Sequence, residues 1–511
     1  MTAAGAEVEQ VDLRLAPAAL TAWAVTAAGT QWQAPGAAVA VVAVVLLAGA
    51  SAWYRHRAAA DPMVASVLAV AVVGAGFAAA IAVRSYQVHH HPITARFGAT
   101  AMVRVTPTEV PRPVAGGRLL IRGTLHRLDD AASSGLVVVF APAADYGEMS
   151  VGRPADFRAV IGPPTRQDLT VAVLSAKGSP RLGEPSPIQR AAQRVRDGVA
   201  QAARNVLPPD QAAMFPALVL GDTSAVTGQV TTQFRTSGLT HLTAVSGANV
   251  TIVCGVLLLT ASLIGPRLAV ALAALGLVGF VVSVTPSASV LRAAAMGAVT
   301  LLAVLTQRRR QAISALGASV LALLVWSPQL AVDVGFALSV VATAGIVVVA
   351  PVWARRMEQC GWPRAAAAAL SVAAVAQLVT APLIAGISGA FSVVAVVANV
   401  AVAPVIPPIT ILGTAAAAVS TQWPALAQLL IRFTGPELWW LLSVARWTSA
   451  LPGASVPTPS GLSGVVTVAI GGLLIVVGWR RRWVRRAAAG CAVILLAWVL
   501  AGQVVGAVGP T

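Results

Sequence analysis

Charged residues are scarce in this chain of 511 residues. Asp, Glu, Lys and Arg together make up 10% of it, against about a quarter of an ordinary soluble domain. Apolar residues reach 57%, and the mean hydropathy is +0.80. Apolar stretches of about 20 residues, long enough to cross a bilayer, recur through the second half. The composition therefore excludes a soluble globular protein and predicts a polytopic α-helical membrane protein.

Lysine and acidic residues are scarcer still. Lys177 is the only lysine, so arginine carries the net charge of +17. Many arginines flank apolar stretches, as the positive-inside rule expects of cytoplasmic loops, so the charge by itself does not indicate nucleic-acid binding. From residue 211 onward the sequence has four acids: Asp222, Asp333, Glu358 and Glu437.

Two charged residues, Arg292 and Asp333, lie within or at the start of apolar stretches. Charges in membrane spans are costly, and those that persist usually face a protein interior or a water-filled path. The two side chains could form a buried ion pair. Alternatively, Asp333 caps the N-terminus of its own helix.

Residues that carry enzyme chemistry are also missing. The three cysteines are far apart, which supports neither a disulfide framework nor a zinc motif. Neither a P-loop nor a dinucleotide fingerprint is present, and "AVSGA" lacks the glycine that a nucleophile elbow needs two residues before Ser246. The consecutive His89, His90 and His91 point in different directions and make a poor preformed metal site. We expect no catalytic residue, metal or cofactor.

The apolar stretches predict roughly 11–13 transmembrane helices. With the arginine clusters inside, the N-terminus lies in the cytoplasm, and the C-terminus and the polar insert after the third span lie outside. The candidate spans are 17–31, 36–54, 63–83, 241–264, 268–285, 288–306, 311–327, 334–354, 364–388, 391–419, 425–450, 463–479 and 486–508. Residues 1–85 form the N-terminal helices, and residues 211–511 form the main membrane domain.

The polar insert, residues 96–184, predicts a small all-β domain outside the cytoplasm. Five segments alternate between apolar and polar residues, and Gly, Pro and Asp separate them. They are "ATAMVRVTP", "RLLIRGTLHRL", "GLVVVFAP", "DFRAVIGPP" and "LTVAVLSAKG". An OB-like barrel is one closure of five strands, and an SH3-like barrel is another. The insert holds 11 Lys and Arg against 8 Asp and Glu, a weakly basic balance.

Residues 187–207 predict one amphipathic helix, because apolar residues recur at steps of three and four. The helix either lies at the membrane interface or packs against the insert.

Polar residues interrupt several predicted spans. "HLTAVSGANV" brings His241, Ser246, Gly247 and Asn249 to the entrance of the fourth span, and Asn399 lies in an apolar run that Pro404, Pro407 and Pro408 then break. Broken helices at membrane depth require protein or water to satisfy the freed backbone groups. These residues either line a hydrated path or bond to neighbouring helices and hold the bundle together.

Five segments resemble the ComEC-type competence proteins, the DNA-uptake channels of transformable bacteria. They are "FPALVLGDTSAV", "FRTSGLTHLTAVSGANVTIV", "SVLRAAAM", "DVGFALSVVATAGI" and "ANVAVAPV", in the family's order. The resemblance implies that the motif positions are Asp222, Arg235, His241, Ser246, Gly247, Arg292, Asp333 and Asn399. Asn249 stands where many relatives have a histidine, and an amide does not titrate.

The resemblance also implies a function. It is the import of single-stranded DNA across the bacterial plasma membrane during transformation, through a multi-pass channel with an OB-like domain. A cytoplasmic motor ATPase and a surface DNA-binding receptor are the implied partners. The resemblance leaves open whether the chain forms a homo-oligomer. Many relatives carry a metallo-β-lactamase-like domain with an HxHxDH motif. No such motif occurs in this sequence, so we expect a short form that relies on a separate nuclease. The alternatives are a transporter of a smaller solute and a membrane scaffold.

Overall fold

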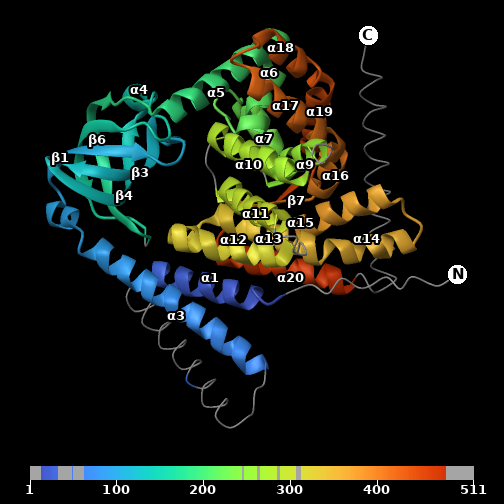
Figure 1. Cartoon of the computed structure of the whole chain (residues 1–511), viewed down its shortest axis with the longest axis horizontal. Coiled ribbons are helices and arrows are strands. Elements are labelled where there is room, and N and C mark those ends of the chain that lie inside the picture. Colours follow the sequence, from blue (N-terminus) through green and yellow to red (C-terminus); the bar gives the residue numbers. More distant parts are fainter. Residues whose placement is uncertain are drawn as a thin grey trace. The chain divides into compact units, whose positions relative to one another are not determined.

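The computed structural model describes residues 13–32, 49, 62–166, 168–243, 247–261, 265–284, 288–305 and 312–478 (Figure 1). Its first elements are helices α1 (Ala16–Gln31), α3 (Pro62–His89) and η1 (Pro92–Arg96), which precede the β domain. The β domain contains β1 (Thr100–Pro107), β2 (Arg112–Val114), β3 (Arg118–Leu128), β4 (Ala131–Pro142), α4 (Ala143–Tyr146), β5 (Ala155–Gly162) and β6 (Thr170–Leu182).

Helices make up nearly all of the remaining described chain. They are α5 (Pro187–Val206), α6 (Pro209–Leu220), α7 (Gly228–Thr236), α8 (Thr240–Thr243), α9 (Gly247–Ala261), α10 (Pro266–Ser283), α11 (Ala288–Leu305), α12 (Ala312–Trp326), η2 (Pro328–Val332), α13 (Val334–Val348), α14 (Ala350–Gln359), α15 (Arg364–Ser388), α16 (Ala395–Val402), η3 (Ala403–Val405), α17 (Ile406–Val419), α18 (Pro424–Arg432), α19 (Gly435–Ser449) and α20 (Leu462–Gly478). Two short strands, β7 (Ala390–Ser392) and β8 (Ser455–Pro457), pair with each other.

The chain folds into two compact units. The first comprises the described residues of 1–226, 242–340 and 406–438, and the second those of 227–241, 341–405 and 439–511.

The β domain is a closed barrel of five strands. β1 pairs with β3 and β5, β3 with β4, and β5 with β6, all antiparallel, whereas β4 and β6 run parallel. The five predicted strands are confirmed as β1, β3, β4, β5 and β6. β2, a short strand beside β3, was not predicted.

The barrel interior holds a single apolar core. Alternate residues of each strand point into it, as in β5, where Phe157, Ala159 and Ile161 are all buried. The short helix α4 carries Tyr146, whose fully buried ring packs edge-on against Phe157 with 5.4 Å between centroids. Burial raises the pKa of the Tyr146 phenol to about 12.

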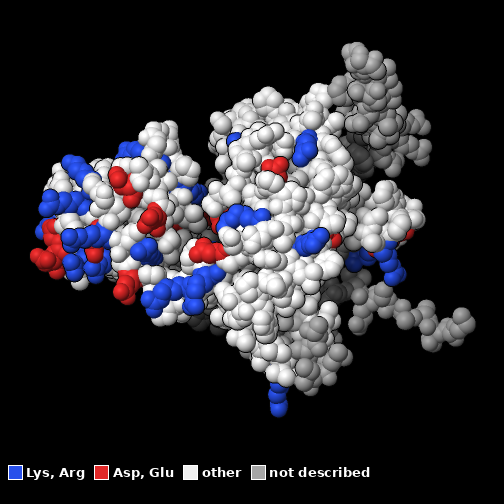
Figure 2. Space-filling view, turned by 90° about the horizontal axis from the view of Figure 1, so that it is seen from above, with Lys and Arg blue, Asp and Glu red and all other residues white. Residues whose placement is uncertain are grey.

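Four helical stretches are long and apolar enough to cross a membrane: Ser66–Arg96, Val334–Gln359, Arg364–Ser388 and Ala395–Val419. Five shorter apolar helices accompany them among the described residues. Charged side chains gather over the β domain, whereas the visible helical surface is largely uncharged (Figure 2). This division of charge agrees with a membrane protein that carries a separate polar domain. The predicted spans 36–54 and 486–508 lie almost entirely outside the described residues.

In the first unit, most of α6 is buried. Its residues from Met214 to Leu220 are all buried, and it packs against α5 and α17. No span was predicted here, because the apolar run is short and contains Pro216.

The predicted amphipathic helix 187–207 is confirmed as α5, which begins with a capping box between Ser186 and Gln189. Its apolar face, including Val199 and Ala202, is buried. α5 contacts α6, α10, α17 and α18, so this face packs on helices, and the first turn of α5 also meets the insert, where Gln189 lies against Gly152. The interfacial placement of its polar face stays a prediction.

In the second unit, α15 contacts α14, α16 and α20. Its bounds match the predicted span 364–388. Close approaches rely on glycine: a Cβ on Gly386 would lie 2.6 Å from Val465. Several predicted spans are interrupted. Span 334–354 is divided at Val349 between α13 and α14, and span 391–419 passes through the 3-10 turn η3 at the predicted proline break. Span 425–450 is two helices, α18 and α19.

Candidate functional site

The motif residues of the first unit begin at the C-terminal end of α6. Gly221 adopts a left-handed conformation (φ 76°), which ends the helix and favours glycine. The Asp222 carboxylate accepts a hydrogen bond from the Ser224 N–H, at 3.0 Å. Burial lowers the pKa of the Arg196 guanidinium on α5, and the charge of Asp222 partly opposes this. Asp222 therefore shapes the turn after α6 and interacts electrostatically with α5.

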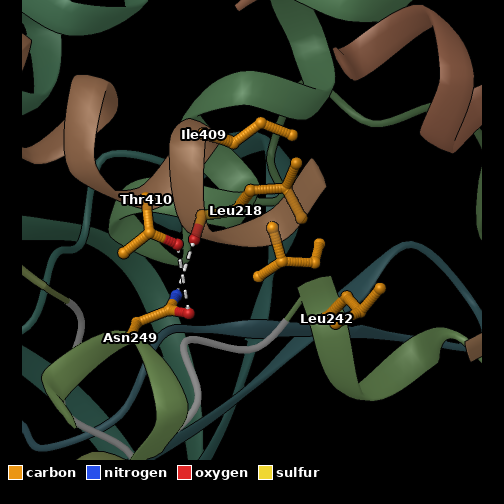
Figure 3. A pocket seen from close by; sticks show the side chains of 6 residues that line it. Leu218, Leu242, Asn249, Ile409 and Thr410 are labelled. Atoms are coloured by element: carbon orange, nitrogen blue, oxygen red, sulfur yellow. Dashed lines mark hydrogen bonds between the residues drawn. The ribbon is translucent and has the colours of Figure 1, made fainter. Parts of the chain in front are cut away.

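Asn249 joins three helices (Figure 3). Its side-chain amide donates to the Leu218 carbonyl of α6 at 3.1 Å, and its oxygen accepts from the Thr410 hydroxyl of α17 at 3.4 Å. The Leu218 carbonyl needs a partner because the N–H of Asp222, which would bond to it in a continuing helix, donates to Pro216 instead.

The surroundings of Asn249 are tightly packed. Asn249 is 6% exposed, and the cavity beside it measures about 10 Å³, room for about one water molecule. Leu218, Leu242, Ile406 and Ile409 line the cavity together with Asn249 and Thr410. The structure thus places Asn249 in the helix-bridging role that the sequence left as the alternative to a lumen.

Arg292 lies where α9, α11 and α13 meet. Its Nε donates to the Ser339 hydroxyl of α13 at 2.7 Å, and its Nη1 lies 3.0 Å from the Met296 sulfur. Gly247, the first residue of α9, faces the guanidinium: a Cβ there would lie 3.0 Å from Nη2. Among the described residues, Arg292 is the only charged residue that is buried, at 5% exposed.

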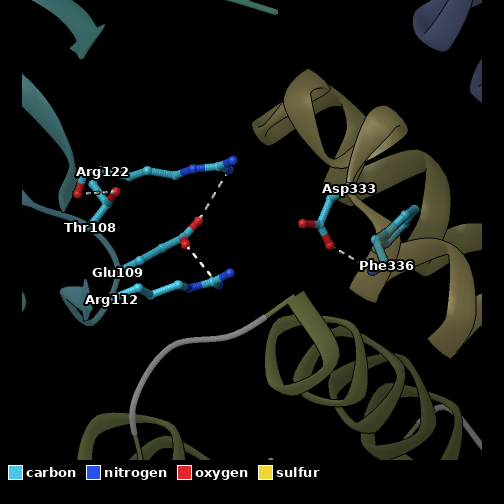
Figure 4. A network of polar contacts seen from close by, with 6 residues as sticks. All are labelled: Thr108, Glu109, Arg112, Arg122, Asp333 and Phe336. Atoms are coloured by element: carbon cyan, nitrogen blue, oxygen red, sulfur yellow. Dashed lines mark hydrogen bonds and ion pairs between the residues drawn. The ribbon is translucent and has the colours of Figure 1, made fainter. Parts of the chain in front are cut away.

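Asp333 caps α13. Its Oδ1 accepts a hydrogen bond from the Phe336 N–H at 2.7 Å (Figure 4), which satisfies one of the free donors of the first helical turn. No ion pair joins Asp333 to Arg292 in the described structure. The buried pair considered from the sequence is therefore wrong, and the capping alternative is confirmed.

The second unit holds Arg235, His241 and Asn399. The Arg235 guanidinium donates to the Ser388 carbonyl at 3.3 Å, and the Asn399 amide donates to the Ala395 and Gly238 carbonyls at 2.8 and 3.5 Å. His241 is exposed.

Gly238, shortly after Arg235, is the glycine of the "SGL" sequence, and its surroundings explain why a glycine stands there. It has φ 72°, and a Cβ on it would lie 2.5 Å from the Ala395 Cβ. Only glycine fits this crossing, because both the left-handed backbone and the close approach exclude a side chain.

Ser246 lies outside the described residues. The structure brings the other motif residues into two groups, one in each unit. Sequence reasoning missed Ser339, Met296 and Thr410, the partners of Arg292 and Asn249. Gly238 stood in a quoted motif, and its place before an apolar helix was a signal for a left-handed turn.

The described residues contain no group of three or more His, Cys, Asp or Glu arranged to hold a metal ion. His89, the last residue of α3, and His90, just after it, instead place Nδ1 against the α3 carbonyls of Ser85 and Tyr86.

These features define a helical membrane protein with a separate β-barrel domain, whose motif residues lie where helices end, cross or break. The chain belongs to the competence protein family, whose match covers residues 218–483, just over half of its length. The resemblance to ComEC-type proteins is thereby confirmed. The chain is also similar to ComE operon protein 3 of Bacillus subtilis (strain 168), at 31% identity over 158 residues. That match covers 30% of this chain and 20% of the relative. No solved structure is significantly similar to this chain.

Proposed function

We propose that this protein is a plasma-membrane channel that imports single-stranded DNA during bacterial competence. Its membership of the competence protein family supports this function. The observation that carries the proposal is the distribution of charge: Arg292 is the only charged residue buried in the described structure, and none of the four acids from residue 211 onward is buried as a whole, although one carboxylate oxygen of Glu437 is enclosed. A path for a polyanion requires cations without buried carboxylates, because buried negative charge would repel phosphates.

The β domain is proposed to be an OB fold on the extracytoplasmic side. Closure in the order β1, β3, β4, β6, β5, with one parallel pair, supports this assignment over an SH3-like barrel, since the OB fold is a five-stranded Greek-key barrel that binds oligonucleotides. The proposal retains 11–13 membrane spans, a cytoplasmic N-terminus and an extracytoplasmic C-terminus. The protein acts as a conduit rather than an enzyme, with a separate motor ATPase and DNA receptor.

The charge distribution is less favourable to an ion-coupled solute transporter. Such a transporter uses buried ionisable residues, and Asp333, the acid we considered for coupling, instead caps a helix.

Uptake of fluorescently labelled DNA by a deletion strain of the host tests the proposal. We expect deletion to abolish internalisation while surface-bound DNA persists, and the full chain to restore import. Asp333→Asn is the informative variant: a neutral cap should keep most import, because an amide oxygen can accept the Phe336 N–H. Unchanged transformation after deletion would refute the proposed function.

A further inference from the structure

The first unit contains an unassigned constellation at Arg292. Three helices contribute to it: Gly247 belongs to α9, Arg292 to α11 and Ser339 to α13. Contacts on both sides of the guanidinium fix the arrangement, with Ser339 at 2.7 Å from Nε and Gly247 against Nη2.

The electrostatics of this crossing are one-sided. Arg292 is 5% exposed, and its described hydrogen-bond partners are a hydroxyl and a thioether, both neutral. No acid occurs between Asp222 and Asp333, and Asp333 is engaged with its own helix. The protein thus buries one positive charge without a described counter-ion.

An uncompensated buried charge is strongly destabilising, so a constellation of this kind is best explained by an anion that arrives from outside. A guanidinium offers paired N–H donors that match two phosphate oxygens. Nη2 makes no hydrogen bond with a described residue, and Gly247 packs close to it, since a Cβ there would come within 3.0 Å of Nη2. The Ser339 hydroxyl, already fixed on Nε, orients the guanidinium.

We infer that Arg292, with Gly247 and Ser339, forms a binding site for one phosphodiester group of a nucleic acid strand. The inference rests on the proposed function and specifies where a passing strand is held. Arg292 contacts the phosphate, Ser339 positions the guanidinium, and the absence of a side chain at Gly247 avoids a clash with Nη2. A lipid phosphate has the same chemistry, so the test separates the two sources.

Binding of a fluorescein-labelled oligothymidylate to the full chain, in nanodiscs of zwitterionic lipid, tests the site. A second oligonucleotide with neutral methylphosphonate linkages removes the anion and keeps the bases. We expect Arg292→Gln to weaken binding of the phosphodiester strand about tenfold or more and to lower the salt slope by about 0.7. Binding of the neutral strand should not change. Arg292→Lys should restore part of the affinity.

Arg267→Gln is the matched control, because Arg267 is exposed at the start of α10 in the same unit. If both Gln variants bind the phosphodiester strand like the wild type, the phosphate site is refuted while DNA binding stands. If the wild type binds neither strand in vitro nor imports DNA in the cell, the proposed function fails with it. Anionic lipid is also titrated into the nanodiscs. If it abolishes the difference in strand binding between the wild type and Arg292→Gln, the site binds a lipid phosphate and the nucleic-acid assignment is refuted.

A second measurement covers the case in which Arg292→Gln does not fold. Ser339→Cys, in a chain whose three native cysteines are replaced, places a thiol beside the guanidinium. We expect an anionic methanethiosulfonate to react faster than a cationic one, relative to a free thiol, and the phosphodiester oligonucleotide to slow the reaction. Faster reaction of the cationic reagent, or no protection by the oligonucleotide, would overturn the inference.

Discussion

Asn249 is the residue at which a role in helix packing can be distinguished most clearly from a role in lining a lumen. Replacing it with alanine removes the donor to the Leu218 carbonyl and the acceptor of the Thr410 hydroxyl. Interhelical hydrogen bonds in membrane proteins contribute about 0.6 kcal/mol each on average and up to about 1.7. Since Asn249 and Thr410 are both buried, we expect Asn249→Ala to lower the free energy of unfolding by about 1–2 kcal/mol.

Reversible unfolding of the full chain in bicelles measures this change. Thr410→Val and the double variant complete a cycle, in which we expect a coupling energy of about 0.6 kcal/mol. Thr251→Ala is the control: Thr251 is exposed on the same helix, and such surface changes usually stay within about 0.5 kcal/mol. The packing role would be refuted if Asn249→Ala left the unfolding free energy unchanged while DNA import per folded molecule fell.

Three further predictions concern other parts of the chain. Gly238→Ala should reduce the amount of folded protein recovered from membranes, because the new Cβ would meet Ala395 at 2.5 Å; Gly228→Ala, with nothing within 4 Å, should be tolerated. Phe157→Ala should destabilise the barrel by about 3–5 kcal/mol, visible as faster hydrogen exchange in β1 and β6, whereas the exposed Met102→Ala should not. The Arg104 guanidinium lowers the pKa of Asp156. Because the folded pKa lies below the unfolded value of about 3.9, the pair stabilises the barrel above about pH 4 and is lost as the pH falls below it. Asp156→Asn should therefore weaken the pH dependence of the barrel's stability below about pH 4. Protection of the barrel amides from hydrogen exchange, measured between pH 2.5 and 5, tests this.

The barrel strands and the apolar helices could be predicted because they depend on local periodicity. Alternating residues gave the five strands, and a long uncharged run gave α15 with its bounds. α6 was not predicted, because its 12 residues are too few for a span. Its burial nevertheless makes it a central helix of the first unit. Span 425–450 was predicted as one helix because its composition is apolar throughout. The chain instead breaks before Gly435 and Pro436, which favour turns and helix starts.

The contacts of the motif residues could not be predicted, because their partners lie far away in sequence. Leu218 and Thr410, which bond to Asn249, are 31 and 161 positions distant from it, and Ser339 is 47 positions from Arg292. Composition showed that polar groups enter apolar segments. Only the folded arrangement shows that the amide of Asn249 completes the end of another helix, whereas Arg292 meets no described carboxylate.

The interrupted helices and the buried Arg292 therefore differ in whether protein groups alone can satisfy them. At η3 the chain leaves regular α-helical geometry, yet the Trp440 indole N–H bonds to the Ala401 carbonyl just before the break, at 2.8 Å. A protein side chain thus satisfies one backbone group beside this break, and the amide of Asn249 also bonds to protein. A guanidinium differs, because a hydroxyl and a thioether cannot neutralise a full positive charge. Among the motif residues that the structure describes, Arg292 is consequently the one whose chemistry calls for something from outside the bundle.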